Sequence, residues 1–415
     1  MTKNQSFPLL MWGLSRGVLF LTMLGVTPLL PTPEGAKAAE WGLGVFNAWD
    51  SQFYESIAVS GYHFQNDGQG YNVAFFPILP LLSWVLMQVG LPFNGAATLV
   101  NNLAFLGALL LLYNWVQQRH GETVARWSTA VLAWCPFSIF GTVIYTEGVF
   151  LCLSTAALRA FENQDHLWAA FWGALATATR VTGVALIPTF LWAAWRQKRG
   201  LRAYLAGGFA SAGLILYCLY CYFRFGDFLA FYHSMEAWNR GTTVHWQGWL
   251  IMFGQIVLGP KNTNREGFEA FVDPWHPLVM GVIAIISLFL WKSRHRFGKT
   301  VIYYGYCVLF LLVWLLVGNP LLNTLMILGG LYLLWHTRQE LGIVPLSYGV
   351  FSYAIILNSG QVTSLERYVY AIVSVSLAFG LVLSRYPRWG RAVMLFFGLL
   401  LILFGLRFAQ GQWVA

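Results

Sequence analysis

Long apolar runs recur along the whole sequence, and short polar segments separate them. Runs such as residues 103–112 and 393–404 are continuously apolar, whereas the strands of a membrane barrel alternate apolar and polar positions. A helix of about 20 apolar residues crosses a hydrocarbon layer of about 30 Å and satisfies its own backbone hydrogen bonds. The pattern therefore predicts an all-α, polytopic integral membrane protein.

The composition supports this prediction and excludes an ordinary soluble fold. The 415 residues are 58% hydrophobic and 10% charged, whereas soluble domains are about 25% charged. No polar stretch is long enough to form a separate domain, so we predict a single integral domain over residues 1–415. The first apolar run, near residues 8–30, is followed by prolines instead of a small-residue cleavage site, and we interpret it as a retained helix.

Basic residues cluster in three short loops, at 196–202, 292–299 and 385–391. The positive-inside rule places such loops on the cytoplasmic side of the membrane. Working outward from them predicts about thirteen membrane-spanning helices, near residues 8–30, 97–116, 127–145, 147–161, 167–178, 182–195, 203–224, 277–291, 300–317, 321–335, 344–357, 367–384 and 392–409.

The three cytoplasmic loops fix whether the number of membrane crossings between them is odd or even, and so which polar segments face outward. The count fits only if segment 75–89 does not cross. We expect a helix there at the outer membrane surface, broken by Pro77 and Pro80. The outward-facing polar segments are a long first outer loop at 31–94, a second outer loop at 225–276 and a short loop at 358–367.

The net charge of +9 at pH 7 could suggest a nucleic-acid partner. The basic residues are concentrated in short loops between apolar runs, however, which is the pattern of membrane topology. We therefore expect membrane lipids around the chain and no nucleic acid. The protein is expected in the plasma (inner) membrane if it is bacterial and in the endoplasmic reticulum membrane if it is eukaryotic.

The first outer loop contains an isolated acid, Asp50, which follows Trp49 and is the only acid between Glu40 and Glu55. A carboxylate held beside an aromatic ring at the membrane edge can serve as a general base, because desolvation raises its pKa toward the working range. The alternative is a helix cap or a solvated loop acid. The same choice applies to Glu147, which either caps a helix or reaches a polar cavity.

Two arginines are candidates for the same cavity. Arg180 lies between two apolar segments that are each too short to span comfortably, and a charge at membrane depth should face a polar cavity or a partner. Arg367 precedes a late helix. The planar fork of arginine suits a phosphate group. The alternatives are a structural pair with an intramembrane acid for Arg180 and an interfacial anchor for Arg367.

Other polar residues do not predict a cofactor. His233 and His245 lack a recognised metal-ligand spacing, so no metal is expected, although a metal site in the second outer loop remains the alternative. Cys218 and Cys221 have CxxC spacing but lie inside an apolar run, where cysteine behaves as a small apolar residue. The chain contains no phosphate-binding glycine loop and no dinucleotide fingerprint.

Several of these residues form motifs of a known family. The blocks are Trp49-Asp50, Ile57-Ala58, Gly61-Tyr62 and residues 74–77 with Pro80; Cys135-Pro136-Phe137 leading to Tyr145-Thr146-Glu147 and Phe150; residues 176–180 with Gly183; and, more weakly, Arg367-Tyr368. In their order and spacing they resemble the PIG-V type mannosyltransferases, relatives of the second mannosyltransferase of GPI-anchor synthesis within the GT-C glycosyltransferases.

The resemblance implies a GT-C-type fold and an inverting transfer of a sugar, typically mannose, from a polyprenyl- or dolichyl-phosphate carrier. The acceptor would be a glycolipid or glycan on the non-cytoplasmic face. The acid of the first outer loop in this superfamily falls on Asp50, the predicted catalytic residue. The residues expected to bind substrates are Trp49, Tyr54, Tyr62, Glu147, Arg180, Arg367 and Tyr368.

The sequence departs from the family pattern at Gly148, where Ser or Ala is usual, and at Val181-Thr182 after Arg180, where a Ser-Asn-like pair is usual. No Phe-Pro pair follows Tyr368. The identity of the acceptor is therefore open. Two other functions are also possible: a transporter or lipid flippase, which commonly shows two related halves, and a non-catalytic subunit of a glycosylation complex.

Overall fold

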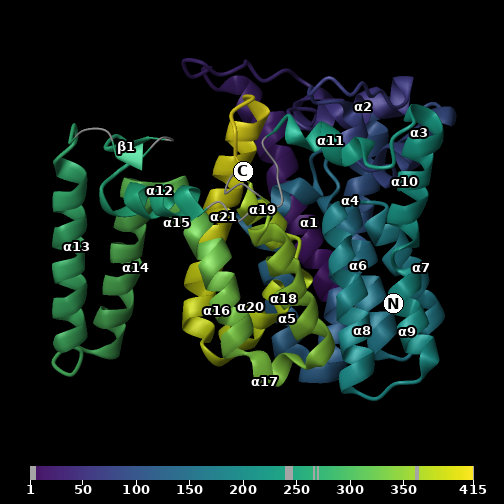
Figure 1. The fold of residues 1–415 in the computed structure, drawn as a ribbon. Coiled ribbons are helices and arrows are strands. Elements are labelled where there is room, and N and C mark those ends of the chain that lie inside the picture. Colours follow the sequence, from purple (N-terminus) through teal and green to yellow (C-terminus); the bar gives the residue numbers. More distant parts are fainter. Residues whose placement is uncertain (1–5, 239–245, 265–266, 269–270, 360–363, 415) are drawn as a thin grey trace.

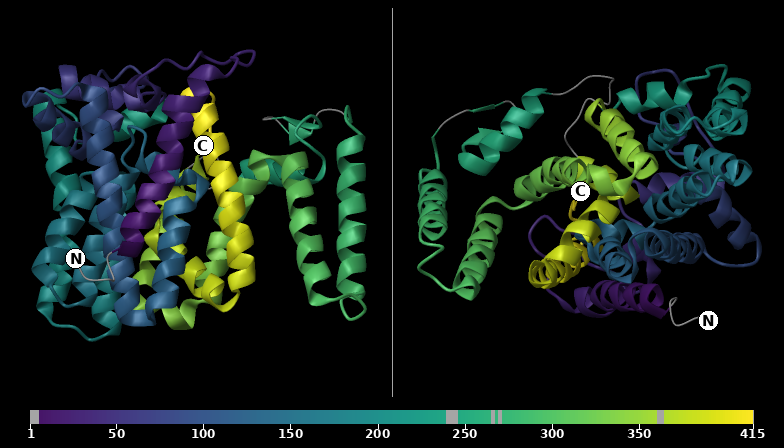
Figure 2. Two further views of the ribbon diagram at one scale, coloured as in Figure 1. Left: turned by 180° about the vertical axis from the view of Figure 1, so that it is seen from behind. Right: turned by 90° about the horizontal axis from the view of Figure 1, so that it is seen from below.

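The computed structural model describes residues 6–238, 246–264, 267–268, 271–359 and 364–414. This part of the chain is helical apart from a small hairpin, in which β1 (Thr263–Asn264) pairs antiparallel with β2 (Gly267–Phe268). Helices lying side by side form a main body, and one helix pair stands apart from it (Figures 1 and 2). The prediction of an all-α fold is confirmed.

Six helical stretches in the described residues are long and apolar enough to cross a membrane. They are α1 (Ser6–Phe20) with its continuations η2 (Leu21–Val26) and η3 (Thr27–Leu29); α4 (Phe93–His120); α9 (Leu201–Phe209) with α10 (Ala212–Phe225); α13 (Trp275–Lys292); α14 (Lys299–Val317); and α21 (Pro387–Ala409). The count of about thirteen crossings stays a prediction, because the other apolar segments are divided into shorter helices.

The shorter helices complete the main body. They are α5 (Glu122–Trp134), η6 (Pro136–Gly141), α6 (Glu147–Glu162), α7 (His166–Thr177), η7 (Val181–Ala185), α8 (Leu186–Arg196), α15 (Asn319–Thr324), η8 (Leu325–Gly329), α16 (Gly330–His336), α17 (Arg338–Leu341), α18 (Ile343–Leu357), α19 (Leu365–Tyr370) and α20 (Val373–Arg385). Helix α4 packs against α5 and α6, α5 packs against α20, and α6 packs against α7.

The prediction of one continuous helix over 127–145 is wrong, because α5 ends at Trp134 and the 3-10 helix η6 follows it. Pro136 has no N–H to donate and cannot continue the α-helical ladder. Arg16, which is 2% exposed, donates hydrogen bonds to the carbonyl oxygens of Ala133 (3.0 Å) and Ser138 (2.6 Å) on the two sides of this break. The chain is thereby held where it turns toward Glu147.

The first outer loop contains helical segments as well as loop: η4 (Leu43–Phe46), α2 (Ser51–Ser60), η5 (Asn72–Ala74) and α3 (Ile78–Gln88). The expected break of the helix at Pro80 does not occur, because this proline lies in the first turn of α3, where its missing N–H costs no hydrogen bond. With 11 residues, α3 is about 16 Å long, which is too short to cross a bilayer.

The second outer loop contains α11 (Ala230–Glu236), α12 (Trp246–Val257) and the small hairpin. Residues 239–245, 265–266 and 269–270 of this loop, and 360–363 of the third outer loop, lie outside the described residues. Helix α12 contacts α15 of the main body. It therefore brings a segment of the second outer loop over the region where α15 begins.

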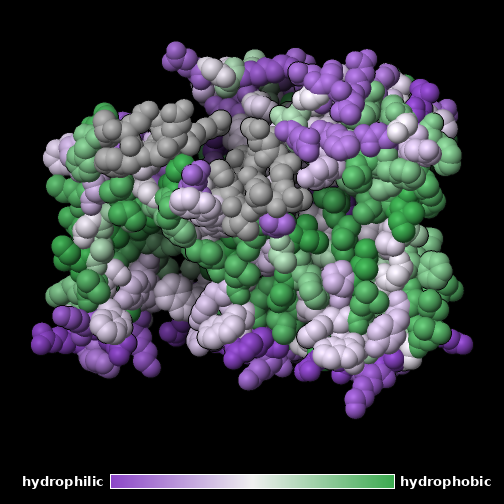
Figure 3. Space-filling view, viewed as in Figure 1, coloured by the Kyte–Doolittle hydropathy of each residue, from purple (hydrophilic) through white to green (hydrophobic). Residues whose placement is uncertain are grey.

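The surface has an apolar belt between two polar ends (Figure 3). The α8–α9 connection and the α13–α14 turn lie at the same end, which is opposite to α2 and α11 (Figure 1). Arg385, which begins the third basic loop, forms an ion pair with Glu340 of α17 at that end. The three basic loops therefore share one side of the molecule, as the topology prediction requires.

Candidate functional site

A cavity of about 950 Å³ lies on the side of the main body that carries α2 and α11. Its walls come from α2, the start of α6, the junction between α7 and η7, and the helices α12, α15, α18 and α19. The site is thus assembled from both halves of the sequence, and the second outer loop contributes one wall.

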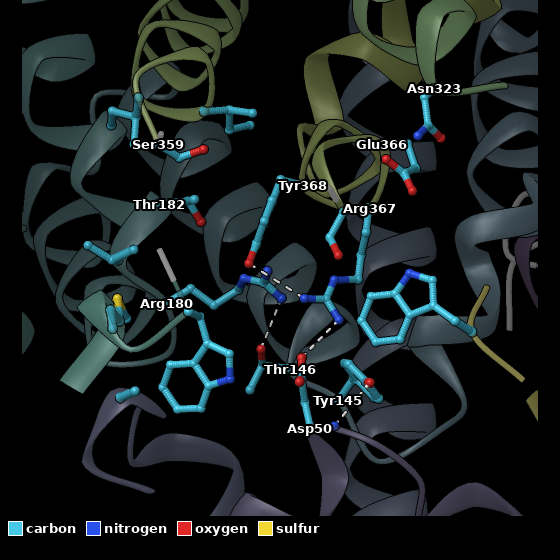
Figure 4. Close-up of a pocket in the computed structure, with 18 of the residues that line it drawn as sticks. Asp50, Tyr145, Thr146, Arg180, Thr182, Asn323, Ser359, Glu366, Arg367 and Tyr368 are labelled. Atoms are coloured by element: carbon cyan, nitrogen blue, oxygen red, sulfur yellow. Dashed lines mark hydrogen bonds and ion pairs between the residues drawn. The ribbon is translucent and has the colours of Figure 1, made fainter. Parts of the chain in front are cut away.

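Asp50 and Arg367 meet in this cavity although 317 positions separate them in the sequence (Figure 4). Arg367 Nη1 donates a hydrogen bond to Asp50 Oδ2 at 3.1 Å. The Asp50 side chain is 29% exposed, whereas that of Arg367 is 4% exposed. The carboxylate is therefore paired on one side and still accessible from the cavity.

The backbone around Asp50 directs this carboxylate into the cavity. Trp49 has a φ of +60°, which few residues other than glycine adopt, and it turns the chain into α2. Asp50 occupies the N-cap position of α2, but its side chain makes no capping hydrogen bond. Its backbone N–H donates to the hydroxyl of Tyr145 at 3.3 Å. A helix cap is therefore not the role of this side chain.

Glu147 is the first residue of α6 and is fully buried. Its Oε1 lies 2.5 Å from Arg180 Nη1 and 3.4 Å from Arg367 Nε. One carboxylate thus pairs with both guanidinium groups. Thr146, which precedes it, accepts a hydrogen bond from Arg180 Nη1 at 3.1 Å and does not cap α6 with its side chain.

Arg180 reaches the cavity because the chain is extended between α7 and η7, with a φ of −154°. Threonine side chains just before Arg180 donate hydrogen bonds to backbone carbonyls of α7 and of the end of α9. Thr177 Oγ1 donates to Ala210 O at 2.8 Å, and Thr179 Oγ1 donates to Leu175 O at 2.7 Å. The break is therefore stable without a continuous helix, and the arginine has an acid as its partner.

Tyr368 lies between the two cationic side chains. The Cζ atoms of Arg180 and Arg367 lie 4.9 and 5.3 Å from its ring centroid. The ring of Tyr145 lies 5.0 Å from Arg367 Cζ. Aromatic faces attract guanidinium groups and exclude water, so these rings fix the positions of both positive charges.

The structure brings five of the eight predicted site residues to the cavity wall: Asp50, Tyr54, Arg180, Arg367 and Tyr368. The other three lie around it. Glu147 lies behind the arginines, Trp49 packs on Trp413 with ring centroids 5.1 Å apart, and the Tyr62 hydroxyl donates to Phe75 O at 2.9 Å.

Sequence reasoning missed a polar group on another wall of the cavity. Glu366 lines the cavity together with Asn319 and Asn323 of α15, and Trp413 lies near the C-terminal end of the chain. Asn319 and Asn323 are four positions apart and share one face of a helix, which is a signal that the sequence contained. Glu366 carries no such signal, because its contact with Asn323 joins two different helices.

Among the described residues no group of three or more His, Cys, Asp or Glu side chains is arranged to hold a metal ion. His233 Nδ1 instead lies 2.6 Å from Asp227 Oδ2, and His245 lies outside the described residues. The charges at the centre of the site belong to two acids and two arginines, so the group is neutral before a substrate binds.

The fold has a known counterpart among membrane enzymes. ArnT from Cupriavidus metallidurans, in a structure with bound undecaprenyl phosphate, superposes with a TM-score of 0.50 at 15% sequence identity, over 94% of this chain and 62% of that chain. The oligosaccharyltransferase of Archaeoglobus fulgidus in its apo form gives a TM-score of 0.48 at 12% identity, over 98% of this chain and 56% of that one. The described part of the chain contains six helical stretches long and apolar enough to cross a membrane, and it thus has a helical membrane-protein fold similar to that of ArnT.

Its sequence is similar to one family in particular. Residues 28–197 match the family model of the mannosyltransferases of the PIG-V type. This segment contains Asp50, Glu147 and Arg180, so the resemblance predicted from these motifs is confirmed over that part of the chain. No protein of curated function matches the sequence. The chain spans about 62% of the length of the ArnT structure that it resembles.

Proposed function

We propose that this protein is an inverting glycosyltransferase whose transferred sugar is mannose. It moves this sugar from a polyprenyl- or dolichyl-phosphate carrier to a hydroxyl group on the non-cytoplasmic face. The observation that carries this proposal is the cluster in one cavity of Asp50, Arg180 and Arg367, with Glu147 behind them. The PIG-V family match over residues 28–197 supports the choice of mannose.

Asp50 acts as the general base. It removes the proton from the acceptor hydroxyl, and the acceptor oxygen forms a bond to the anomeric carbon of the sugar. The bond between this carbon and the phosphate oxygen breaks, and the electron pair leaves with the polyprenyl phosphate. A single displacement of this kind inverts the configuration at the anomeric carbon.

The pair of Asp50 and Arg367 links proton transfer to the stabilisation of the leaving group. The carrier phosphate gains one negative charge when the sugar leaves, and Asp50 loses its negative charge when it takes the proton. Arg367 is then released from its carboxylate partner at 3.1 Å and can neutralise the phosphate. Preplaced cations in a cavity with little water contribute most where charge develops in the transition state.

Glu147 holds the two arginines in position. It is fully buried and does not line the cavity, whereas both guanidinium groups lie within 3.4 Å of its Oε1. Two adjacent guanidinium groups repel each other, and a carboxylate between them offsets that repulsion before the phosphate arrives. We therefore prefer this orienting role to direct contact with sugar hydroxyls.

The lipid part of the donor approaches from the side of η7. The break between α7 and η7 leaves Val181 36% exposed beside Arg180. A prenyl chain can lie along this apolar surface while its phosphate reaches the arginine. The ArnT structure with the same fold contains undecaprenyl phosphate, a carrier of this chemical class.

A direct test uses the purified protein in sealed vesicles that contain polyprenyl-phosphate-mannose with a labelled sugar. Release of polyprenyl phosphate, with the label appearing in an acceptor or in water, is expected. Movement of the intact donor across the vesicle membrane without cleavage would instead identify a flippase. Absence of both cleavage and movement would exclude both functions for this donor.

A further inference from the structure

Glu366 and Asn323 form a second polar group in the cavity. Glu366 is 4% exposed and lies in α19 beside Arg367, and the side-chain amide of Asn323 lies 3.3 Å from both of its carboxylate oxygens. The Asn323 amide is oriented with its nitrogen toward the acid, and it donates N–H to the Glu366 carboxylate oxygens. Figure 4 shows this pair on one side of Arg367 and Arg180 on the other.

The carboxyl group of Glu366 is not used to neutralise a cation. Its sequence neighbour Arg367 pairs with Asp50 and Glu147 instead, and no ion pair of Glu366 occurs in the part of the chain that the structure describes. Burial raises the pKa of Glu366 to about 7, because a low dielectric disfavours the charged form. A neutral carboxyl beside a carboxamide offers both donors and acceptors of hydrogen bonds.

The surroundings of the pair differ from those of the arginine side. Beside Arg180 the cavity is lined by Val181 and by the hydroxyl-bearing side chains of Thr179 and Thr182. Near Glu366, α15 contributes Asn319 as well as Asn323, and α12 contributes Gln255 to the cavity lining. In the described part of the chain, the cavity lining thus contains three side-chain amides, two of which lie on the helix that contacts Glu366.

We propose that Glu366 and Asn323 bind hydroxyl groups of the sugar acceptor and set the affinity of the site for it. This inference rests on the proposed transferase function and names the residues that recognise its acceptor. In-line displacement requires the nucleophile and the leaving phosphate on opposite faces of the transferred sugar. Arg180 and Glu366 lie on different sides of the Arg367 side chain (Figure 4), so a phosphate at the first and an acceptor at the second would approach the sugar from different directions.

The test measures transfer from polyprenyl-phosphate-mannose to octyl mannoside, and release of mannose to water when no acceptor is added. Glu366→Ala and Asn323→Ala are each expected to raise the KM for octyl mannoside about 10-fold, the effect of one lost hydrogen bond to a substrate. The KM for the donor and the rate of release to water should stay within about 2-fold of wild type, because an effect below about 0.4 kcal/mol is within ordinary non-additivity. Glu366→Gln keeps a neutral hydrogen-bonding group and should restore the KM.

Glu40→Ala is the matched control, because Glu40 is an acid of the first outer loop whose side chain is 77% exposed and does not line the cavity. Equal loss of transfer and of release to water in Glu366→Ala would show a structural role and overturn the proposal. Wild-type protein that releases mannose to water but does not transfer it to octyl mannoside would also overturn it. Wild-type protein that does neither would overturn the transferase function itself.

Discussion

Glu147 Oε1 lies 2.5 Å from Arg180 Nη1, and this buried contact joins the start of α6 to the break between α7 and η7. Both residues belong to the segment that matches the mannosyltransferase family. Glu147 and Arg180 form the buried part of the site. The partly exposed pair of Asp50 and Arg367 adjoins it, because Glu147 Oε1 also contacts Arg367 Nε.

Replacing Glu147 by Gln removes the charge that compensates both arginines and keeps the size of the side chain. Removing one partner of a buried ion pair costs about 3–5 kcal/mol. We expect a lower apparent melting temperature in detergent and a large loss of transfer. Glu122→Gln is the control, because Glu122 pairs with Arg126 at an exposed position. An unchanged melting temperature for Glu147→Gln would contradict the role of this acid.

Arg180→Lys keeps a positive charge but loses the planar fork that binds phosphate with two hydrogen bonds. We expect the affinity for polyprenyl phosphate to fall about 10-fold or more, which corresponds to one charge-assisted hydrogen bond. Arg202→Lys, an exposed position at the start of α9, should leave the affinity unchanged. Unchanged affinity in both variants would remove Arg180 from the phosphate site.

Arg16 stabilises the fold without a carboxylate partner in the described residues. Besides two backbone carbonyls, it donates to Ser138 Oγ at 2.7 Å and to Thr142 Oγ1 at 2.8 Å. Arg16→Met leaves buried acceptors unsatisfied, at a cost of about 1–3 kcal/mol for each one that water cannot reach. A clearly lower melting temperature is expected, whereas Arg202→Met should have almost no effect.

Gly148 explains one departure from the family pattern. A Cβ at this position would overlap with the backbone oxygen and the side chain of Asn101 on α4. Asn101 Nδ2 donates to Phe140 O at 2.8 Å and to Val143 O at 2.7 Å, so it also holds the segment before α6. Gly148→Ala should destabilise the protein by about 1–3 kcal/mol through overpacking.

The control for this substitution is Gly17→Ala, because nothing lies within 4 Å of a Cβ at Gly17. Alanine has the higher helix propensity, so the control should be neutral or slightly stabilising. If Gly148→Ala were as stable as wild type in the same thermal unfolding measurement, α4 and α6 would be less closely packed than the structure indicates.

The charged residues that meet in the cavity could be named from the sequence because charges are rare in an apolar chain. Asp50, Arg180 and Arg367 stand out for this reason, and the family motifs include the first two and, more weakly, Arg367. Their pairing could not be predicted. The contact between Asp50 and Arg367 joins residues 317 positions apart and depends on how α2 and α19 are packed.

Helix boundaries were less predictable, because continuously apolar segments carry no amphipathic period to mark a break. The interruption at Pro136 within the segment 127–145 is one example, and the division of the late helix into α19 and α20 is another. Glu366 was missed for a related reason. Its place in the site depends on a contact with Asn323 on another helix, which no local pattern shows.

The central claim is that Asp50 is the base of a sugar transfer. The most direct measurement compares the rate of mannose transfer from polyprenyl-phosphate-mannose by wild type, by Asp50→Asn and by Asp67→Asn. Asp67 is a fully exposed acid of the same outer loop. Loss of a general base lowers a rate about 100- to 10,000-fold. The account predicts this loss for Asp50→Asn, with unchanged expression and melting temperature, and a wild-type rate for Asp67→Asn. A normally folded Asp50→Asn variant with the wild-type rate would contradict it.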